Sequence, residues 1–271
     1  MWRWRDATSR SVAVRMSLGF ALCLALAHLT VLSQAAIAPA KAVSLDESIK
    51  LTWQPQPEDK KAHLIWFNKT SYESWSNSLD NYLEVYRTPS ITPGRLENLV
   101  KCNHSSHPQA GGVCHVSIDS YSPCVSTNYF GYKKLTPCVF IEIEKVPNWK
   151  PKFYTDMSDL PKDIPEKLRN YIDEKTVYSY EWENVWVSCE GETPADQEFI
   201  GSVQYIPEPA FPAYFYPYDE RPGYLSPVVA VHFLHPKHGV IINVECKLWA
   251  PNIEHNRKKG IGLTRFQILI D

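Results

Sequence analysis

The clearest pattern in this chain is an alternation of apolar and polar side chains in its second half. Val139, Ile141 and Ile143 share one face of an extended segment, while Glu142 and Glu144 share the other. Strands follow one another without helices between them, which favours an antiparallel β-sandwich over a parallel α/β sheet. The predicted strands are Cys138–Glu144, Val185–Cys189, Val228–Phe233, Val240–Trp249 and Leu263–Ile270.

Only one helix is predicted in this half, from Asp163 to Lys175, with Asp163 as its cap and Pro165 in its first turn. Earlier in the chain, residues 39–81 are interpreted as a polar stalk in which prolines prevent a continuous helix. Within that stalk, the apolar run Leu64–Phe67 is either a strand or a contact with a membrane surface. Residues 82–271 are then the main folded domain, which is mainly β.

An apolar run at residues 16–38 follows a short basic tail, residues 1–15. As a helix this run is about 35 Å long, enough to cross the hydrocarbon core of a bilayer. The upstream arginines would keep the tail in the cytoplasm and place the rest of the chain outside. A cleaved signal peptide explains the same residues, because small side chains at 36–40 form a possible cleavage site. Both interpretations export the remainder of the chain.

Six of the seven cysteines follow that apolar run, which is typical of a disulfide-linked exterior domain. Cys189 and Cys246 each share a strand face with apolar residues, so both are predicted to point inward and to bridge two facing sheets. Cys138 shares a face with Glu142, which predicts a peripheral loop bridge. Of fifteen possible connectivities, this sorting favours Cys189–Cys246 and leaves Cys102–Cys114 and Cys124–Cys138 as small sequential loops.

Charge and motifs argue against several classes of function. The formal net charge is −2 and no long basic stripe occurs, so no nucleic acid partner is predicted. Nucleophile elbows, zincin helices and glycine-rich phosphate loops are also missing from the sequence. The histidines near Cys102 and Cys114 do not have the spacing of a zinc finger. We therefore expect no catalytic residues, no metal, no cofactor and no small-molecule substrate.

Two sequons, beginning at Asn68 and Asn103, are predicted glycosylation sites in an exported chain. The most unusual segment is residues 206–227, which holds six prolines and six aromatic residues. Prolines hold such a loop extended before a partner arrives, and tyrosines supply contact area with few rotatable bonds. The same composition is also typical of an internal loop whose aromatic side chains cover the edge of the sandwich.

Three stretches resemble the β subunit of the Na⁺/K⁺-transporting ATPase, and its insect forms in particular. They are Phe130-Gly131-Tyr132-Lys133 with Pro137-Cys138, Phe215-Tyr216-Pro217-Tyr218 with Tyr224-Leu225-Ser226-Pro227, and Glu245-Cys246-Lys247. The resemblance covers residues 82–271. It implies an immunoglobulin-like exterior domain on a single-pass type II glycoprotein of the plasma membrane, with residues 16–38 kept as a signal-anchor.

The resemblance also implies a function without catalysis. A β subunit of this kind assembles with the pump's catalytic α subunit, assists its folding and delivery, and tunes its cation affinity. The resemblance implies that Phe215, Tyr216, Pro217 and Tyr218 contact the α subunit, and that neighbouring cysteines pair in order. The apolar run contains one aromatic residue, Phe20, where the family has several. This departure leaves a second class open, a pump-independent adhesion, junction or secreted glycoprotein.

Overall fold

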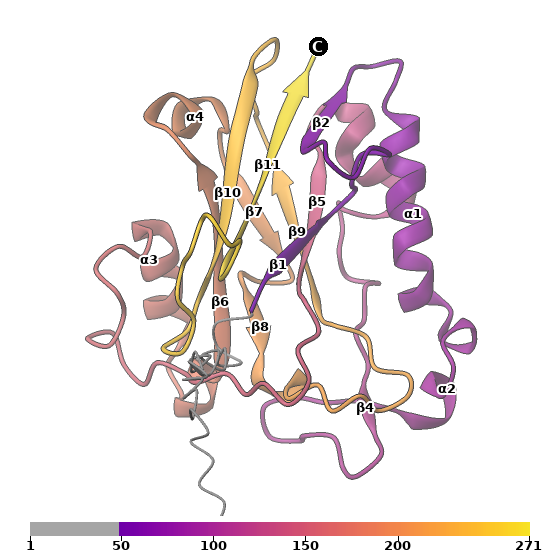
Figure 1. Cartoon of the computed structure of the whole chain (residues 1–271), viewed down its shortest axis with the longest axis vertical. Helices are drawn as coiled ribbons and strands as arrows, with labels where there is room; N and C mark the ends of the chain where they lie inside the picture. The colour runs from indigo at the N-terminus through magenta and orange to yellow at the C-terminus, as the bar shows by residue number, and fades with distance from the viewer. Residues whose placement is uncertain (1–48) are drawn as a thin grey trace, which may run out of the picture. The chain divides into compact units, whose positions relative to one another are not determined.

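Two β-sheets dominate the computed structural model, which describes residues 49–271 (Figure 1). Sheet A has the strand order β1-β5-β9-β7, and sheet B has the order β2-β11-β10-β6-β8. Within these sheets neighbouring strands are antiparallel, except that β2 runs parallel to β11. The strands are β1 (Leu51–Gln54), β2 (Leu64–Phe67), β5 (Cys138–Ile143), β6 (Asn184–Gly191), β7 (Val203–Ile206), β8 (Ala210–Pro212), β9 (Val228–Phe233), β10 (Ile241–Trp249) and β11 (Leu263–Ile270).

Shorter elements surround the two sheets. A small parallel pair consists of β3 (Leu99–Val100) and β4 (Val113–Cys114). The helices are α1 (Glu73–Arg87), α2 (Arg95–Asn98), α3 (Glu166–Lys175) and α4 (Pro194–Phe199). The 3₁₀ segments are η2 (Pro89–Ile91), η3 (Ser126–Lys134), η4 (Ser179–Trp182) and η5 (Ala213–Phe215).

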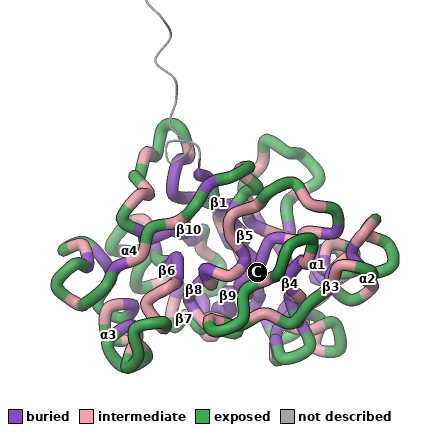
Figure 2. Tube along the Cα trace, turned by 90° about the horizontal axis from the view of Figure 1, so that it is seen from below, coloured by how far each residue is buried: buried purple, intermediate pink, exposed green. Residues whose placement is uncertain are grey.

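The main core lies between the inner faces of the two sheets. The Phe266 ring of sheet B lies 5.1 Å from the Trp53 ring and 6.2 Å from the Phe233 ring, both of sheet A. Tyr205 reaches across from β7, and its hydroxyl accepts a hydrogen bond from the Cys189 backbone N–H of β6 at 2.6 Å. Seen from below, the buried residues run along the strands and the exposed ones lie in the surrounding loops (Figure 2). The prediction of a mainly β chain with packed sheets is confirmed.

Every strand predicted from alternation is present, and Leu64–Phe67 is the strand β2. The strands β1, β7 and β8 were not predicted, because each has at most four residues and each adjoins or contains a proline. These short strands complete the edges of sheets whose centres have the regular pattern.

The predicted stalk at residues 39–81 is wrong for its described part, residues 49–81. Strands β1 and β2 pair within the two sheets, and Ile49, Ile65 and Phe67 belong to the core. Helix α1 begins at Glu73 and runs past the expected boundary at residue 82. Its buried positions, Ser76, Leu79, Leu83 and Tyr86, recur every three or four residues. The folded domain therefore starts before α1.

Helix α3 begins at Glu166 rather than at Asp163. Pro165 has an extended backbone with ψ of 137°, so it precedes the helix as its N-cap residue and does not lie in the first turn. The helix buries Leu168 and Ile172 against a second, smaller core around Trp186 on the outer face of sheet B. In Figure 1, α3 and α1 flank opposite sides of the strands.

The six cysteines of the described residues form three disulfides, Cys102–Cys114, Cys124–Cys138 and Cys189–Cys246. The expectation that the third bridges facing sheets is wrong. Cys189 and Cys246 are directly opposed partners on the neighbouring strands β6 and β10 of sheet B, with Cα atoms 4.0 Å apart. Both cysteines are buried, as their apolar neighbours predicted. Face analysis identified the burial but could not tell facing strands from adjacent ones.

The expectation that Cys138 is peripheral is also wrong. Cys138 is fully buried, and β5 is an inner strand of sheet A. The face that it shares with Glu142 is not open to solvent, since the Tyr86 side chain of α1 lies over it. Alternation correctly placed these residues on one face, but a helix covers that face.

The basic tail at residues 1–15 and the apolar run at residues 16–38 lie outside the described residues. Within residues 49–271, none of the helices has the length and apolar character needed to cross a bilayer.

Candidate partner-binding loop

The segment of residues 206–227, called here the proline-aromatic loop, connects the two sheets. It leaves β7 of sheet A, pairs through β8 with β6 of sheet B, and returns to β9 of sheet A. Between β8 and β9 it has only the short 3₁₀ segment η5. The loop is thus tied to the fold at both ends and along β8.

The four expected contact residues lie together in this loop, but they are unequally accessible. Phe215 is 7 % exposed and packs with the core. Tyr216 is half-buried, its hydroxyl is enclosed, and its ring meets the Trp149 ring edge-on at 5.6 Å. Burial raises the pKa of Tyr216 well above its ordinary value. Pro217 and Tyr218 are half-buried and follow at the surface. The first two residues pack inward, and the last two lie at the surface.

A lysine from the end of β5 fixes the outer part of the loop. The Lys145 Nζ donates to the Tyr224 carbonyl oxygen at 3.3 Å. The same ammonium lies 5.8 Å from the Tyr218 ring centroid and 5.6 Å from that of Tyr224, and these two rings are 4.9 Å apart. A cation held between two tyrosine faces restrains both rings. Lys145 is therefore a positioning residue for Tyr218.

Beneath this lysine, a glutamate and tyrosines from α1 support the loop. The Tyr86 hydroxyl donates to the Ser226 carbonyl oxygen at 3.0 Å and lies 3.4 Å from the Glu142 carboxylate. Burial raises the pKa of Glu142, although hydrogen bonding from Tyr82 and the charge of Lys145 oppose this effect. Because Tyr86 bonds a loop carbonyl, packing of α1 determines where the loop lies.

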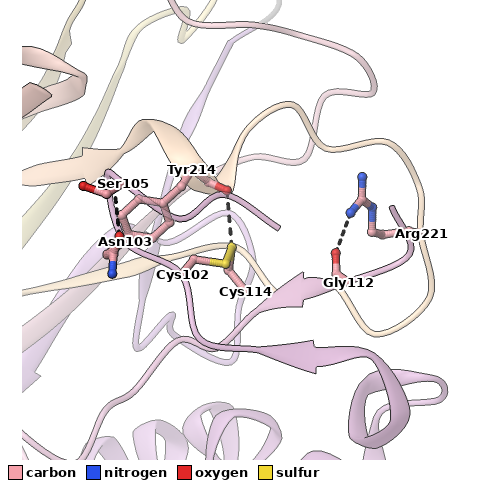
Figure 3. Close-up of a disulfide and its surroundings, with 7 residues drawn as sticks. All are labelled: Cys102, Asn103, Ser105, Gly112, Cys114, Tyr214 and Arg221. Atoms are coloured by element: carbon pink, nitrogen blue, oxygen red, sulfur yellow. Dashed lines mark hydrogen bonds between the residues drawn. A yellow bond between two sulfur atoms is a disulfide. The ribbon is translucent and has the colours of Figure 1, made fainter. Parts of the chain in front are cut away.

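The disulfide-closed segment Cys102–Cys114 holds the loop from the other side (Figure 3). The Arg221 guanidinium donates to the Gly112 carbonyl oxygen and pairs with Asp219. The Cys114 Sγ lies 3.3 Å from the Tyr214 carbonyl oxygen. The disulfide therefore closes the segment Cys102–Cys114, and this segment in turn supports the proline-aromatic loop through Gly112 and Cys114.

The two predicted glycosylation sequons lie in different settings. Asn68 follows β2, and its Oδ1 accepts hydrogen bonds from the Thr70 N–H and the Thr70 hydroxyl, each at 2.8 Å. Asn103 is exposed beside Cys102, and its Oδ1 accepts from the Ser105 N–H at 2.9 Å. Both asparagines therefore sit in turns stabilised by their own side chains.

Comparison with known proteins identifies the family. A family model described as "Sodium / potassium ATPase beta chain" matches residues 19–268. The chain belongs to the sodium/potassium ATPase beta chain family. It is 47 % identical over 221 residues to sodium/potassium-transporting ATPase subunit beta-2 of Drosophila melanogaster, a match that covers 80 % of this chain and 68 % of that relative. The resemblance predicted from the loop and strand motifs is confirmed.

Other members of the beta chain family are more distant. Subunit beta-1 of Drosophila melanogaster is 36 % identical over 199 residues, which cover 73 % of this chain and 61 % of that relative. Human subunit beta-2 is 24 % identical over 223 residues, covering 75 % of this chain and 67 % of the relative. The matched part thus spans about two thirds of the relatives' length. The family is that of the pump's non-catalytic chain.

Proposed function

We propose that this chain is the beta chain that assembles with the catalytic α subunit of a Na⁺/K⁺-transporting ATPase and assists its folding, its delivery to the plasma membrane and its cation affinity. The observation that carries this proposal is the family match over residues 19–268, which includes part of the apolar run and nearly all of the described domain. The three disulfides support an exterior location. We also assign the two sheets to an immunoglobulin-like exterior domain.

The proline-aromatic loop is the proposed α-subunit contact. Phe215 and Tyr216 act from within, and Pro217 and Tyr218 contact the partner. Anchors of this kind commonly contribute about 2 kcal/mol to an interface. Tyr218→Ala should therefore weaken α-subunit co-purification about thirtyfold at limiting concentration. Tyr178→Ala removes an exposed tyrosine outside this loop and serves as the control.

The test is co-expression of the full chain with the catalytic α subunit of a sodium/potassium pump, followed by co-purification and assay of ATP hydrolysis. Co-purification of the unmodified chain supports the proposal. If a folded Tyr218→Ala chain assembles as well as the control, the contact role is wrong. If the unmodified chain assembles with no pump α subunit, the proposal is replaced by a pump-independent adhesion, junction or secreted function. The single aromatic residue of the apolar run is the observation that favours this alternative.

The membrane topology needs its own test. We propose that residues 16–38 remain as an uncleaved signal-anchor, with the tail cytoplasmic and the sheets outside. N-terminal sequencing of the mature protein distinguishes this from a signal peptide, since a start between Pro39 and Val43 means a soluble product. Peptide mapping before and after glycan removal tests Asn68 and Asn103 in the same preparation.

A further inference from the structure

Basic side chains line a hollow whose residues all lie outside the proline-aromatic loop. This hollow, called here the basic groove, has a volume of about 780 Å³ and lies between β1 of sheet A and β11 of sheet B. Glu144 and Glu192 are the carboxylates that line it. Its basic lining residues are Lys50, Lys61, Arg257, Lys259 and Arg265. Against a net charge of −2 for the whole chain, this is a local concentration of positive charge.

The five cations come from separate segments that the fold brings together. Lys50 directly precedes β1, and Lys61 lies in the connection from β1 to β2. Arg257 and Lys259 lie in the connection from β10 to β11, and Arg265 is on β11 itself. No basic stripe exists in the sequence, so this feature depends on the pairing of the two sheets.

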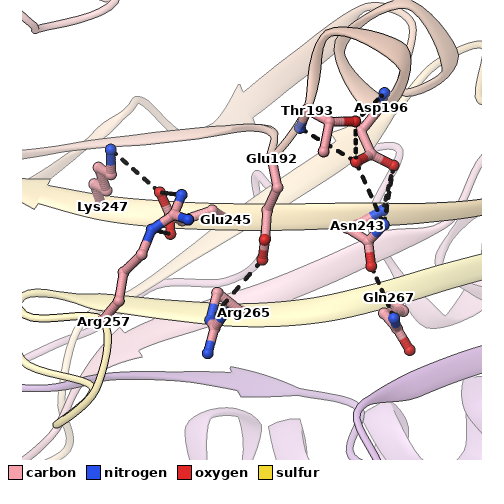
Figure 4. A network of polar contacts seen from close by, with 9 residues as sticks. All are labelled: Glu192, Thr193, Asp196, Asn243, Glu245, Lys247, Arg257, Arg265 and Gln267. Carbon is pink, nitrogen blue, oxygen red and sulfur yellow. Dashed lines mark hydrogen bonds and ion pairs between the residues drawn. The ribbon is translucent and has the colours of Figure 1, made fainter.

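Both arginines face glutamates, Arg257 in close contact and Arg265 at the outer limit of an ion pair (Figure 4). The Arg257 Nε lies 2.7 Å from a Glu245 oxygen, and its Nη2 donates to the other oxygen at 2.9 Å. The Arg265 Nε lies 3.9 Å from Glu192. Because Glu245 is 6 % exposed and central on β10, it anchors the β10–β11 connection and with it Lys259. One side of the groove is therefore preorganised.

The three lysines are the available charges. Lys50, Lys61 and Lys259 are exposed, and none of them lies within 4.0 Å of a carboxylate among the described residues. An ammonium group on a flexible stem can follow a row of anionic groups.

We propose that the basic groove binds a linear sulfated polysaccharide. Sulfate groups stay ionised at physiological pH and recur along such a chain, which matches cations spread along a seam between two sheets. The hollow shape suits a chain that lies inside it, whereas a flat bilayer surface would not reach its walls. Three disulfides indicate an oxidising compartment outside the cytosol, where such polysaccharides are found and nucleic acids are not the common polyanions.

The test uses the purified full-length chain and a short heparin-derived oligosaccharide, with affinity measured by calorimetry at several salt concentrations. The variant Lys50→Gln/Lys61→Gln/Lys259→Gln removes three charges, keeps polar side chains at these positions and leaves both arginines in place. We expect it to bind about tenfold more weakly, and the slope of log K against log salt to fall by about two to three, as three counterion-releasing contacts are lost. The control variant is Lys101→Gln/Lys134→Gln/Lys162→Gln, which removes three exposed lysines elsewhere and should bind like the unmodified chain.

Two further probes separate the ligand classes. Hyaluronan, a linear polysaccharide with carboxylates but no sulfate, should bind at least about tenfold more weakly than the heparin fragment. Phosphatidylserine vesicles should bind no better to the unmodified chain than to the triple variant. Equal heparin affinity in the groove variant and the control variant overturns the proposal. Equal affinity for hyaluronan, or groove-dependent binding of vesicles but not of heparin, overturns the assignment to a sulfated polysaccharide.

Discussion

Sheets A and B each carry a glutamate on the outer face of an inner strand, Glu142 on β5 and Glu245 on β10. The two lie in opposite surroundings. Phenols surround Glu142, with Tyr86 and Tyr82 reaching it from α1, and its pKa is raised because burial outweighs these contacts. Burial would also raise the pKa of Glu245, but hydrogen bonds from Arg257 and Lys247 reverse the effect and lower it.

The difference arises from what covers each face. Helix α1 and the proline-aromatic loop lie over sheet A, so Glu142 belongs to a support for the proposed partner contact. Around Glu245 on sheet B the neighbours are charged instead: Lys247 of the same strand and Arg257 of the β10–β11 connection reach its carboxylate, as Figure 4 shows. The same alternating strand pattern therefore supports a covered face on sheet A and, beyond the part of its outer face that α3 covers, a more open charged face on sheet B.

The largest expected effect tests the cover over sheet A. Leu83 of α1 is 2 % exposed, so Leu83→Ala should lower the free energy of unfolding by about 2–5 kcal/mol through lost burial and a cavity. Ile241→Ala on β10 is the matched change on the open sheet, where the side chain is 49 % exposed, and should cost less than about 1 kcal/mol. Denaturant unfolding under non-reducing conditions measures both. Similar losses of unfolding free energy in the two variants would show that the two faces are covered to the same extent.

A smaller effect tests the link between α1 and the loop. Tyr86→Phe removes the hydrogen bond to the Ser226 carbonyl oxygen and leaves a buried acceptor without its donor. We expect a loss of about 1–2 kcal/mol, measured by the same unfolding assay. Tyr178→Phe, which removes a hydroxyl from an exposed tyrosine, should change stability by less than about 0.5 kcal/mol. A loss at Tyr86 no larger than the control value would contradict the support role of α1.

Sheet B offers the next test. Glu245→Gln removes the charge that holds Arg257 and Lys247, whose side chains are 53 % and 30 % exposed. Since water solvates both cations well, the expected loss is about 1 kcal/mol. High salt should reduce the difference between the unmodified and the variant chain, because screening weakens exposed ion pairs. A difference that grows with salt would exclude the ion pairs as its cause.

Much of this arrangement was predictable from local patterns, and the limits have physical causes. Alternation placed the strands and assigned the buried faces of Cys189 and Cys246, since both depend on side chains two residues apart. It could not identify neighbouring strands, so the bridge within sheet B was assigned to facing sheets. It also could not reveal that α1 covers Glu142, because that contact joins residues more than fifty positions apart.

The candidate sites show the same division. Composition and family resemblance singled out residues 215–218, because these four residues are contiguous and form a recognisable motif. Lys145 was missed as a positioning residue, since only the folded chain brings it between Tyr218 and Tyr224. The basic groove was missed for the same reason: its cations lie in four segments, and the sequence-wide charge conceals them.

The smallest expected effect is a difference between the two glutamates in how their contributions to stability depend on pH. A raised pKa in the folded state means that ionised Glu142 opposes folding, so its contribution to stability improves as the pH falls through its folded pKa towards the ordinary glutamate value of about 4.3. A lowered pKa means that ionised Glu245 favours folding. Its contribution is present above the ordinary value and is lost as the pH falls through its folded pKa.

The two variants should therefore change stability near pH 7 in opposite directions, and both differences should fade on acidification. Glu142→Gln should remove the gain on acidification from pH 7 to about pH 4.5, and stability relative to the unmodified chain should be highest near pH 7. Glu245→Gln should instead differ most from the unmodified chain near pH 7 and converge with it below about pH 4. Unfolding free energies measured at constant ionic strength across this range decide the matter. Parallel curves for the two variants would mean that Glu142 and Glu245 have the same environment, which contradicts the contrast between the covered and the open sheet.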